Sequence, residues 1–260
     1  MKTVAFHTLG CKLNFSETST IKRQLIASGL IESSFNEGAD LFIINTCSVT
    51  ENANKECRRL IRKAKKISPN SRVIITGCYA QLKPESIIEI DGVDLVVGAK
   101  EKFNIFKYLN NFKKGIHGCE INNLDYFPSF SIEERSRSYV KVQDGCNYPC
   151  TYCTIPLARG KSRSDFIKNI ISKIEDIGSK GTKEVVLTGV NIGDYKEPIS
   201  NKNFYDLINE IEKVDVIDRF RISSIEPNLI TDEIIDFVKN SKKFVPHFHI
   251  PLQSGNNKIL

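Results

Sequence analysis

The chain has 260 residues, of which 40% are hydrophobic and 26% charged, so it can bury one or two cores and is neither a disordered tail nor a collagen-like repeat. The net charge of +6 is a weak indication of an anionic partner. Apolar runs are strand-length and the N-terminus lacks a signal pattern, so we expect a cytoplasmic protein with no membrane contact. In that reducing compartment, eight cysteines indicate metal or redox chemistry rather than disulfides.

Three segments of the first half share one plan, in which a short apolar run ends in a small polar stretch and then a cysteine. They cover residues 4–11, 41–47 and 73–78. Each leads into a helical pattern, and a fourth strand at 93–97 leads into a helix near 101–111. Strands that alternate with helices predict a parallel α/β sheet.

The cysteines of these segments are Cys11, Cys47 and Cys78, and each directly follows a predicted strand. Strands of a parallel sheet all end at the same edge, so the three thiols are expected to converge there. Open α/β sheets bind their ligands at that edge.

The helix after Cys47 opens with a capping-box pattern at Ser48–Glu51. Cys57 lies on its apolar face, which favours packing over chemistry. Its other face is strongly basic, which suits either a solvated surface or a stripe that contacts RNA.

Residues 113–137 lack periodicity and predict a linker, with room for one short strand, between a domain at 1–112 and a second α/β region at 138–260. The second region repeats a βα unit, with strands at 139–142, 184–188, 220–224 and 247–250. This is the pattern of a (β/α) barrel. Four strands cannot close a barrel, so we expect a partial barrel and a chain that is a fragment of a longer protein.

The loop after the first strand of this region holds Cys146, Cys150 and Cys153 at C-x3-C-x2-C spacing. A structural zinc site normally has four ligands, and no fourth Cys or His follows before His247. Three thiolates in one loop instead favour a cubane iron–sulfur cluster whose fourth iron stays open.

At these residues the chain resembles the radical S-adenosylmethionine (SAM) superfamily, in which such a loop binds a 4Fe–4S cluster and the open iron binds the cofactor. Tyr152, just before the last cysteine, also matches this pattern and is expected near the cofactor. The resemblance implies a partial radical-SAM barrel behind an N-terminal open parallel α/β sheet domain.

The N-terminal cysteines, the residues around the loop and the segment His249–Gly255 resemble the methylthiotransferases, radical SAM enzymes that insert a methylthio group. In that family Cys11, Cys47 and Cys78 would hold a second 4Fe–4S cluster. Residues 10–14, Glu17 and 45–50 look most like the branch that acts on threonylcarbamoyl-adenosine beside the tRNA anticodon. The alternatives are isopentenyl-adenosine in tRNA, an aspartate of a ribosomal protein, or a metal-binding module without catalysis.

Small and polar residues at the ends of the later strands are expected to contact the SAM cofactor. They are Gly189, Asn191, Ser224, Glu226 and Gln253. Strand-end position favours this role, whereas composition fits ordinary turn and cap chemistry equally well. His247 and His249 share a strand face, where packing is favoured over catalysis.

Arg159 and Arg163 lie just after the cysteine loop and are expected to contact phosphates of the tRNA anticodon stem-loop. The family chemistry also requires an electron donor such as flavodoxin or ferredoxin. Cys119, in the linker, is assigned no role.

Overall fold

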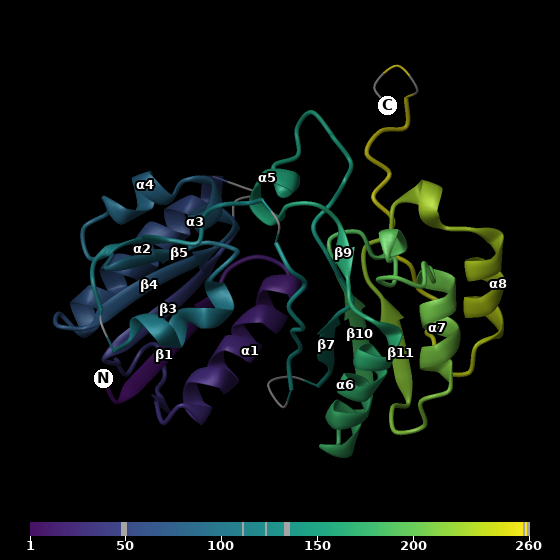
Figure 1. Cartoon of the computed structure of the whole chain (residues 1–260), viewed down its shortest axis with the longest axis horizontal. Coiled ribbons are helices and arrows are strands. Elements are labelled where there is room, and N and C mark those ends of the chain that lie inside the picture. Colours follow the sequence, from purple (N-terminus) through teal and green to yellow (C-terminus); the bar gives the residue numbers. More distant parts are fainter. Residues whose placement is uncertain (48–50, 111, 123, 133–135, 257, 259–260) are drawn as a thin grey trace. The chain divides into compact units, whose positions relative to one another are not determined.

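The computed structural model describes residues 1–47, 51–110, 112–122, 124–132, 136–256 and 258. The chain forms two compact units (Figure 1). Unit 1 comprises Met1–Asp125 and Asn147–Gly160, and unit 2 comprises Tyr126–Cys146 and Lys161–Leu260. This division differs from the predicted one, because most of the cysteine loop groups with the first unit. The capping box predicted at Ser48–Glu51 lies largely outside the described residues.

Unit 1 is built on a parallel sheet with the strand order β2-β1-β3-β4-β5-β6. The strands are β1 Thr3–Thr8, β2 Ile31–Glu32, β3 Leu41–Thr46, β4 Arg72–Gly77, β5 Leu95–Val97 and β6 Gly115–His117. The helices of this unit are α1 Lys12–Ala27, α2 Glu51–Ile67, α3 Cys78–Leu82, α4 Pro84–Ile88, the 3-10 helix η1 Lys102–Tyr108, and α5 Ile155–Arg159. The predicted parallel α/β sheet is confirmed, and the short linker strand is β6, which extends it.

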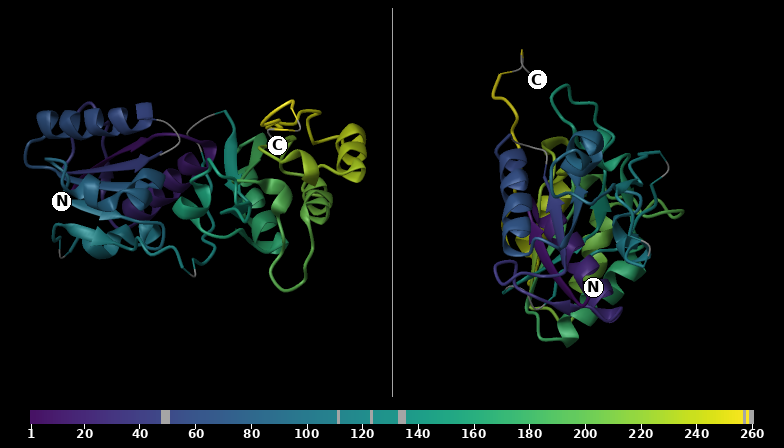
Figure 2. Two further views of the ribbon diagram at one scale, coloured as in Figure 1. Left: turned by 90° about the horizontal axis from the view of Figure 1, so that it is seen from above. Right: turned by 90° about the vertical axis from the view of Figure 1, so that its left-hand side faces the viewer.

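Side chains of the central strands are buried on both faces of this sheet. In β3, Phe42 and Ile44 pack in the core beneath α2, whereas Leu41 and Ile43 pack in the core beneath α1. Helices α1 and α2 therefore cover opposite faces (Figure 2). Alternation along a strand explains why β3 is apolar at every one of these positions. Cys57 belongs to the α2 core, as its position on the apolar face predicts.

Unit 2 has a parallel sheet in the order β11-β10-β7. Its strands are β7 Ser138–Lys141, β10 Glu184–Thr188 and β11 Arg219–Ile222, with a separate antiparallel pair, β8 Gln143–Asp144 and β9 Arg163–Ser164. The remaining elements are α6 Ile167–Ser179, α7 Phe204–Glu212, α8 Asp232–Asn240, and the 3-10 turns η2 Ile192–Asp194 and η3 Pro227–Leu229. Alternating strands and helices with parallel pairing confirm the predicted βα pattern.

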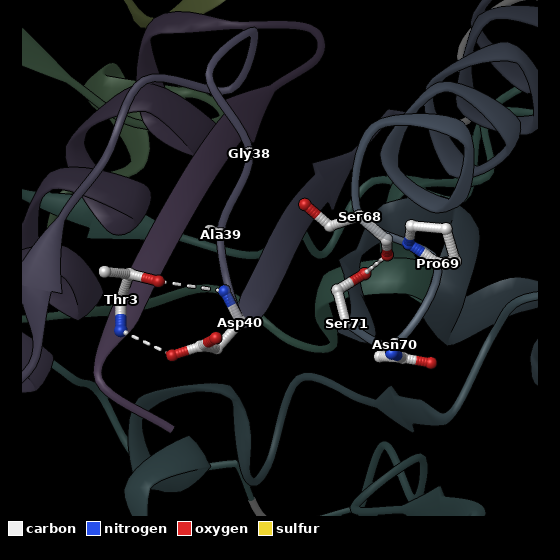
Figure 3. Close-up of a pocket in the computed structure, with 8 residues that line it drawn as sticks. All are labelled: Thr3, Gly38, Ala39, Asp40, Ser68, Pro69, Asn70 and Ser71. Carbon is white, nitrogen blue, oxygen red and sulfur yellow. Dashed lines mark hydrogen bonds between the residues drawn. The ribbon is translucent and has the colours of Figure 1, made fainter.

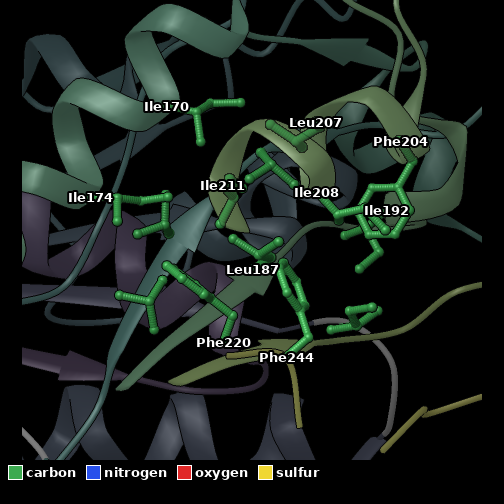
Figure 4. Packing of buried hydrophobic residues seen from close by; sticks show 14 of the residues in the cluster. Ile170, Ile174, Leu187, Ile192, Phe204, Leu207, Ile208, Ile211, Phe220 and Phe244 are labelled. Atoms are coloured by element: carbon green, nitrogen blue, oxygen red, sulfur yellow. The ribbon is translucent and has the colours of Figure 1, made fainter. Parts of the chain in front are cut away.

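The core of unit 2 forms where α6 and α7 pack on the sheet (Figure 4). Ile170 and Ile174 of α6 meet Leu187 of β10 and Phe220 of β11 in one buried cluster. Each such side chain contributes about 1.5–3 kcal/mol when fully buried. This packing fixes the ends of β10 and β11, which precede several of the residues predicted to contact the cofactor.

The predicted strand at 247–250 is wrong as a regular strand. His249 forms only an isolated parallel bridge with Ser224, and Phe244 forms another with Phe220. Pro246 and Pro251 flank the segment, and proline has no amide hydrogen to donate to a strand ladder. The helix predicted near 101–111 is the 3-10 helix η1. Among the described residues, no helix combines the length and the apolar character needed to cross a membrane.

Candidate functional site

The three N-terminal cysteines follow three neighbouring strands of the unit 1 sheet. Cys11 caps α1 after β1, Cys47 follows β3, and Cys78 is the first residue of α3 after β4. These strands end side by side, because Thr8 pairs with Asn45 in the register of the sheet and the next residue, Thr46, pairs with Gly77. The convergence expected from the strand order is therefore present at the level of the backbone.

Gly10 shows how closely the first two cysteine segments approach. Its φ of +97° is a backbone conformation that suits glycine, and a Cβ atom at this position would lie 2.7 Å from Cys47 Cβ and 2.9 Å from its Sγ. Any larger residue would collide with the Cys47 side chain. The close approach of Cys47 thus requires glycine at position 10.

A buried hydrogen-bond network ties these cysteine segments together. Asn14 Nδ2 donates to the carbonyl oxygen of Leu9 at 2.9 Å and to that of Thr46 at 3.0 Å. Thr46 Oγ1 donates to the Thr76 carbonyl at 2.5 Å and accepts from the Ala80 amide at 3.2 Å. Asn14 therefore joins the residues before Cys11 and Cys47, and Thr46 extends the network to both sides of Cys78.

The donor set of this edge fits an iron–sulfur cluster. Cys11, Cys47 and Cys78 are free thiols, and thiolates are the usual ligands of such clusters. Burial raises the pKa of the Cys78 thiol, and the nearby charges of Arg159 and Lys102 oppose that rise. Within the described residues no three His, Cys, Asp or Glu side chains already stand in metal-binding geometry.

The second set of cysteines lies in an irregular loop. Cys146 belongs to unit 2, whereas Cys150 and Cys153 belong to the part of the loop that groups with unit 1. The Cys153 amide donates to the Cys150 carbonyl at 3.1 Å, which closes a tight turn between these two thiols. Cys150 is exposed and the other two are partly exposed, so all three thiols are accessible to a metal.

Gln143, at the base of this loop, was missed by the sequence reasoning. Its buried amide donates to the Gly145 carbonyl at 2.7 Å and to Ser162 Oγ at 2.9 Å. Its Oε1 accepts from the amides of Val190 and Asn191, both at 3.0 Å. One side chain thus links the residue before Cys146 to the segment after β10.

Two buried polar groups lie in this region, one in the segment after β10 and one just after β11. Among the described residues, nothing forms a hydrogen bond with Asn191 Nδ2 or Ser223 Oγ. Asn191 Oδ1 accepts from the Glu226 amide at 3.3 Å, which fixes the orientation of the Asn191 amide. Leaving a buried donor unpaired costs about 1–3 kcal/mol, so such groups are typical of a ligand site. A Cβ on Gly189 would lie 2.8 Å from the Gln143 carbonyl, so the chain is tightly packed here.

The other predicted cofactor residues are placed as follows. Ser224 Oγ lies 2.8 Å from His249 Nδ1, and Glu226 is half-buried. Gln253 is exposed with a φ of +63°, and the Tyr152 side chain is 69% exposed. Ser223, which the structure singles out, stands next to the predicted Ser224.

Arg159 and Arg163 are both engaged in ion pairs. Arg159 is only 3% exposed, and its Nη1 lies 3.0 Å from Glu17 Oε1 within unit 1. This burial corrects the expected phosphate contact of Arg159, because its guanidinium is directed at a carboxylate inside the protein. Arg163 Nη2 lies 3.2 Å from Asp144 Oδ2 and is more accessible.

A cavity of about 350 Å³ lies at the opposite edge of the unit 1 sheet, before the strands begin (Figure 3). Asp40 there accepts from the amides of Lys2 at 2.7 Å and Thr3 at 3.1 Å. These backbone hydrogen bonds lower the pKa of the Asp40 carboxyl. Its carboxylate is already used to join the starts of β1 and β3, so we assign the cavity no chemistry.

Two family models match separate parts of the chain. Residues 3–98 match the family described as "Uncharacterized protein family UPF0004", and residues 140–260 match the radical SAM superfamily. The radical SAM methyltransferase TsrM of Kitasatospora setae, solved with cobalamin and a 4Fe–4S cluster bound, has a similar fold. Its TM-score is 0.64 at 13% identity, over 97% of this chain and 59% of that one. The second part of the chain therefore matches the radical SAM superfamily, a class that uses an iron–sulfur cluster and SAM.

Comparison with curated relatives indicates which enzymes of this class the chain is similar to. The threonylcarbamoyladenosine tRNA methylthiotransferases of Bacillus subtilis and Aquifex aeolicus are 41% and 39% identical over 100% and 99% of the chain. A tRNA-2-methylthio-N(6)-dimethylallyladenosine synthase of Hydrogenobaculum is 33% identical over 97%. The chain spans 59%, 64% and 60% of the lengths of these relatives. The chain is therefore similar to tRNA methylthiotransferases along nearly all of its own length.

Proposed function

We propose that this protein adds a methylthio group to threonylcarbamoyl-modified adenosine next to the tRNA anticodon. The observation that carries the proposal is the presence of two separate three-cysteine sets, one at adjacent strand ends and one in the C-x3-C-x2-C loop. The relatives named for threonylcarbamoyladenosine are 35–41% identical to the chain, and those named for dimethylallyladenosine are 30–33% identical. This difference favours the first substrate.

Two 4Fe–4S clusters and SAM fit the residues present. Cys146, Cys150 and Cys153 would hold one cluster, and Cys11, Cys47 and Cys78 would hold the other. When bound, the cluster at the loop cysteines and SAM would supply one-electron radical chemistry, and the cluster at Cys11, Cys47 and Cys78 would supply the sulfur to be transferred. An electron donor such as flavodoxin or ferredoxin, and a cytoplasmic location, belong to this proposal.

The protein's own side chains would bind and orient the cofactor. Asn191 Nδ2 and Ser223 Oγ are buried donors, and we propose that polar groups of SAM accept hydrogen bonds from them. Gln143 holds the Asn191 backbone and the base of the cysteine loop in one arrangement, so cofactor and cluster ligands are positioned together. Ser224 and Glu226 lie within three residues of Ser223, and together with Gln253 and Tyr152 they complete the proposed contact set. Arg163 remains the proposed contact to an RNA phosphate.

Nucleoside analysis tests the proposed substrate. Bulk tRNA from cells that lack the gene is digested and examined by mass spectrometry, with tRNA from the parent strain as control. We expect methylthiolated threonylcarbamoyl-adenosine to disappear and the unmethylthiolated form to accumulate. Loss of the methylthiolated isopentenyl nucleoside alone, or unchanged tRNA with a mass shift on a ribosomal protein, would contradict the proposal.

A further inference from the structure

Helix α2 of unit 1 accounts for the whole net positive charge of the chain. The chain has 37 basic and 31 acidic residues. Residues 55–66, which lie within α2, hold seven of the basic residues and one acidic residue, Glu56, so the rest of the chain carries thirty of each. The excess charge is therefore a property of one helix rather than of the whole surface.

Four of these cations form one row on the solvent side of α2. Lys55, Arg59, Arg62 and Lys66 recur at i, i+4, i+7 and i+11, and all four are exposed. The opposite side of the helix is apolar and packs on the sheet, with Leu60 only 1% exposed. At the α-helical rise of 1.5 Å per residue the row is about 16 Å long. We call these four residues the basic stripe.

Carboxylates neutralise little of the basic stripe within the part of the chain that the structure describes. Arg59 Nη2 lies 2.5 Å from Glu56 Oε1. Lys55, Arg62 and Lys66 form no ion pair with any described residue. Like charges three or four residues apart on a helix repel one another, so the stripe costs α2 stability that a bound polyanion would offset.

The chemistry of the basic stripe fits a phosphate backbone better than a membrane or another protein. Among the described residues, no exposed large apolar side chain lies in α2. A helix that lies on a membrane inserts an apolar face, and the apolar face of α2 is in the core. Protein interfaces are centred on aromatic or other large anchors that this surface lacks. A row of Lys and Arg along one helix is the electrostatic footprint of nucleic acid binding.

The basic stripe also starts near the edge of the sheet that carries the strand-end cysteines. Helix α2 begins at Glu51, four residues after Cys47, and runs back along the sheet to Ile67, before β4 begins at Arg72 (Figure 2). An RNA backbone along the stripe would therefore lead to the edge where Cys47 lies.

We propose that the basic stripe of α2 binds the phosphate backbone of the substrate RNA and holds its stem beside the strand-end cysteines. The three cations without a carboxylate partner, Lys55, Arg62 and Lys66, each neutralise one phosphate. Contacts of this kind position an RNA without reading its base sequence. This inference rests on the proposed function in one respect, that the substrate is an RNA.

Binding of an anticodon stem-loop RNA to the whole chain tests the proposal. Fluorescence anisotropy gives Kd at several salt concentrations for the stripe variant, which combines Lys55→Gln, Arg62→Gln and Lys66→Gln. Glutamine is a good helix former, so α2 should stay helical, which circular dichroism checks. A second variant keeps the charge of every position through Lys55→Arg, Arg62→Lys and Lys66→Arg.

The matched control makes the same change of charge in unit 2. It combines Lys168→Gln on α6, Lys239→Gln on α8 and Lys242→Gln, all at exposed positions. A hairpin of the same length and unrelated sequence serves as a second RNA probe. Polyglutamate and phosphatidylserine vesicles are the probes for an acidic protein and for a membrane.

We expect the stripe variant to bind RNA about 10-fold more weakly or worse, and the slope of log Kd against log salt to fall by about 2–3, because three phosphate contacts are lost. Both hairpins should show the same loss. The charge-keeping variant and the unit 2 control should stay within about 2-fold of the unaltered chain. The melting temperature of the stripe variant should be unchanged or higher, because repulsion within α2 is relieved.

An unchanged Kd in the stripe variant, or an equal loss in the unit 2 control, would overturn the inference and leave the proposed function intact. Loss of binding to polyglutamate or to vesicles without loss of RNA binding would assign the stripe to another partner and would overturn it too. An unaltered chain that binds neither hairpin would overturn the inference through its premise, and the nucleoside analysis then decides the proposed function separately.

Discussion

Cys11, Cys47 and Cys78 are separated by more than 30 residues each, yet they follow neighbouring strands of one sheet. Cys146, Cys150 and Cys153 instead share one short loop, and that loop is divided between the two compact units. The first set is held by a buried network around Asn14 and Thr46. The second set is anchored at its two ends, by Gln143 before Cys146 and by Arg159 after Cys153. The first site therefore depends on the whole sheet, whereas the second depends on local spacing and two anchors.

Thiol reactivity gives the largest expected contrast between these cysteines and the structural ones. Burial raises the pKa of Cys57 to about 12, from an ordinary 9.0. At pH 8 its thiolate fraction is about a thousandfold lower than that of an unshifted thiol, and labelling should accelerate as the pH rises toward 12. In protein without metal, iodoacetamide should label the exposed Cys11 and Cys150 first, read by peptide mass spectrometry. Equal labelling of Cys57 in folded protein would refute this placement, and urea-unfolded protein is the control.

Removing Asn14 should damage the first site and leave the second intact. Asn14→Ala removes the side-chain donor to the Leu9 and Thr46 carbonyls and one of the acceptors of the Arg159 guanidinium. We expect a loss of about 2–4 kcal/mol in the free energy of unfolding, measured in denaturant without metal. After reconstitution about four irons should remain, on the loop cysteines. Asn70→Ala, at the opposite edge of the sheet, is the control, and an equal loss in both variants would count against the Asn14 network.

Replacing Gln143 is the reverse experiment, because it should affect the loop site rather than the site at the strand ends. Gln143→Met keeps the size of the side chain but removes its hydrogen bonds to Gly145, Ser162, Val190 and Asn191. SAM affinity, measured by calorimetry on reconstituted protein, should fall about 10-fold or more because two loops lose their common anchor. Gln143→Glu retains an accepting oxygen but places a carboxylate oxygen against the Gly145 carbonyl, so its loss of affinity should be at least as large. Unchanged affinity in both variants would show that the anchor is dispensable.

Replacing each of the two adjacent serines after β11 with alanine should change the stability of the protein in opposite directions. Ser223 Oγ has no hydrogen-bond partner among the described residues, so Ser223→Ala should leave stability unchanged or raise it by up to about 1 kcal/mol. The same change should weaken SAM binding about 5- to 10-fold. Ser224→Ala breaks the contact with His249 and should lower stability by about 1 kcal/mol. If Ser223→Ala destabilises the protein and leaves SAM affinity unchanged, Ser223 does not face the cofactor.

Sequence patterns predict the parts of the molecule that local rules determine. The alternation of strands and helices places Cys11, Cys47 and Cys78 at one edge, and the spacing of the loop cysteines is visible directly. Asn14 and Gln143 were not predicted, because their partners lie 32 and 47 residues away and an amide side chain gives no pattern of its own. Arg159 was expected to contact RNA because its observed partner, Glu17, lies 142 residues away and gives no local sequence signal. The prediction of a strand at 247–250 was wrong because it followed the apolar pattern of these residues and gave too little weight to the two flanking prolines.

Iron counting on site-specific variants tests the existence of two separate clusters most directly. After anaerobic reconstitution the unaltered chain should hold about eight irons. Replacing Cys11, Cys47 and Cys78 with alanine should leave about four, replacing the three loop cysteines should also leave about four, and replacing Cys57 and Cys119 should leave about eight. An unaltered chain with about four irons, or a near-complete loss in either triple variant, would contradict two independent clusters.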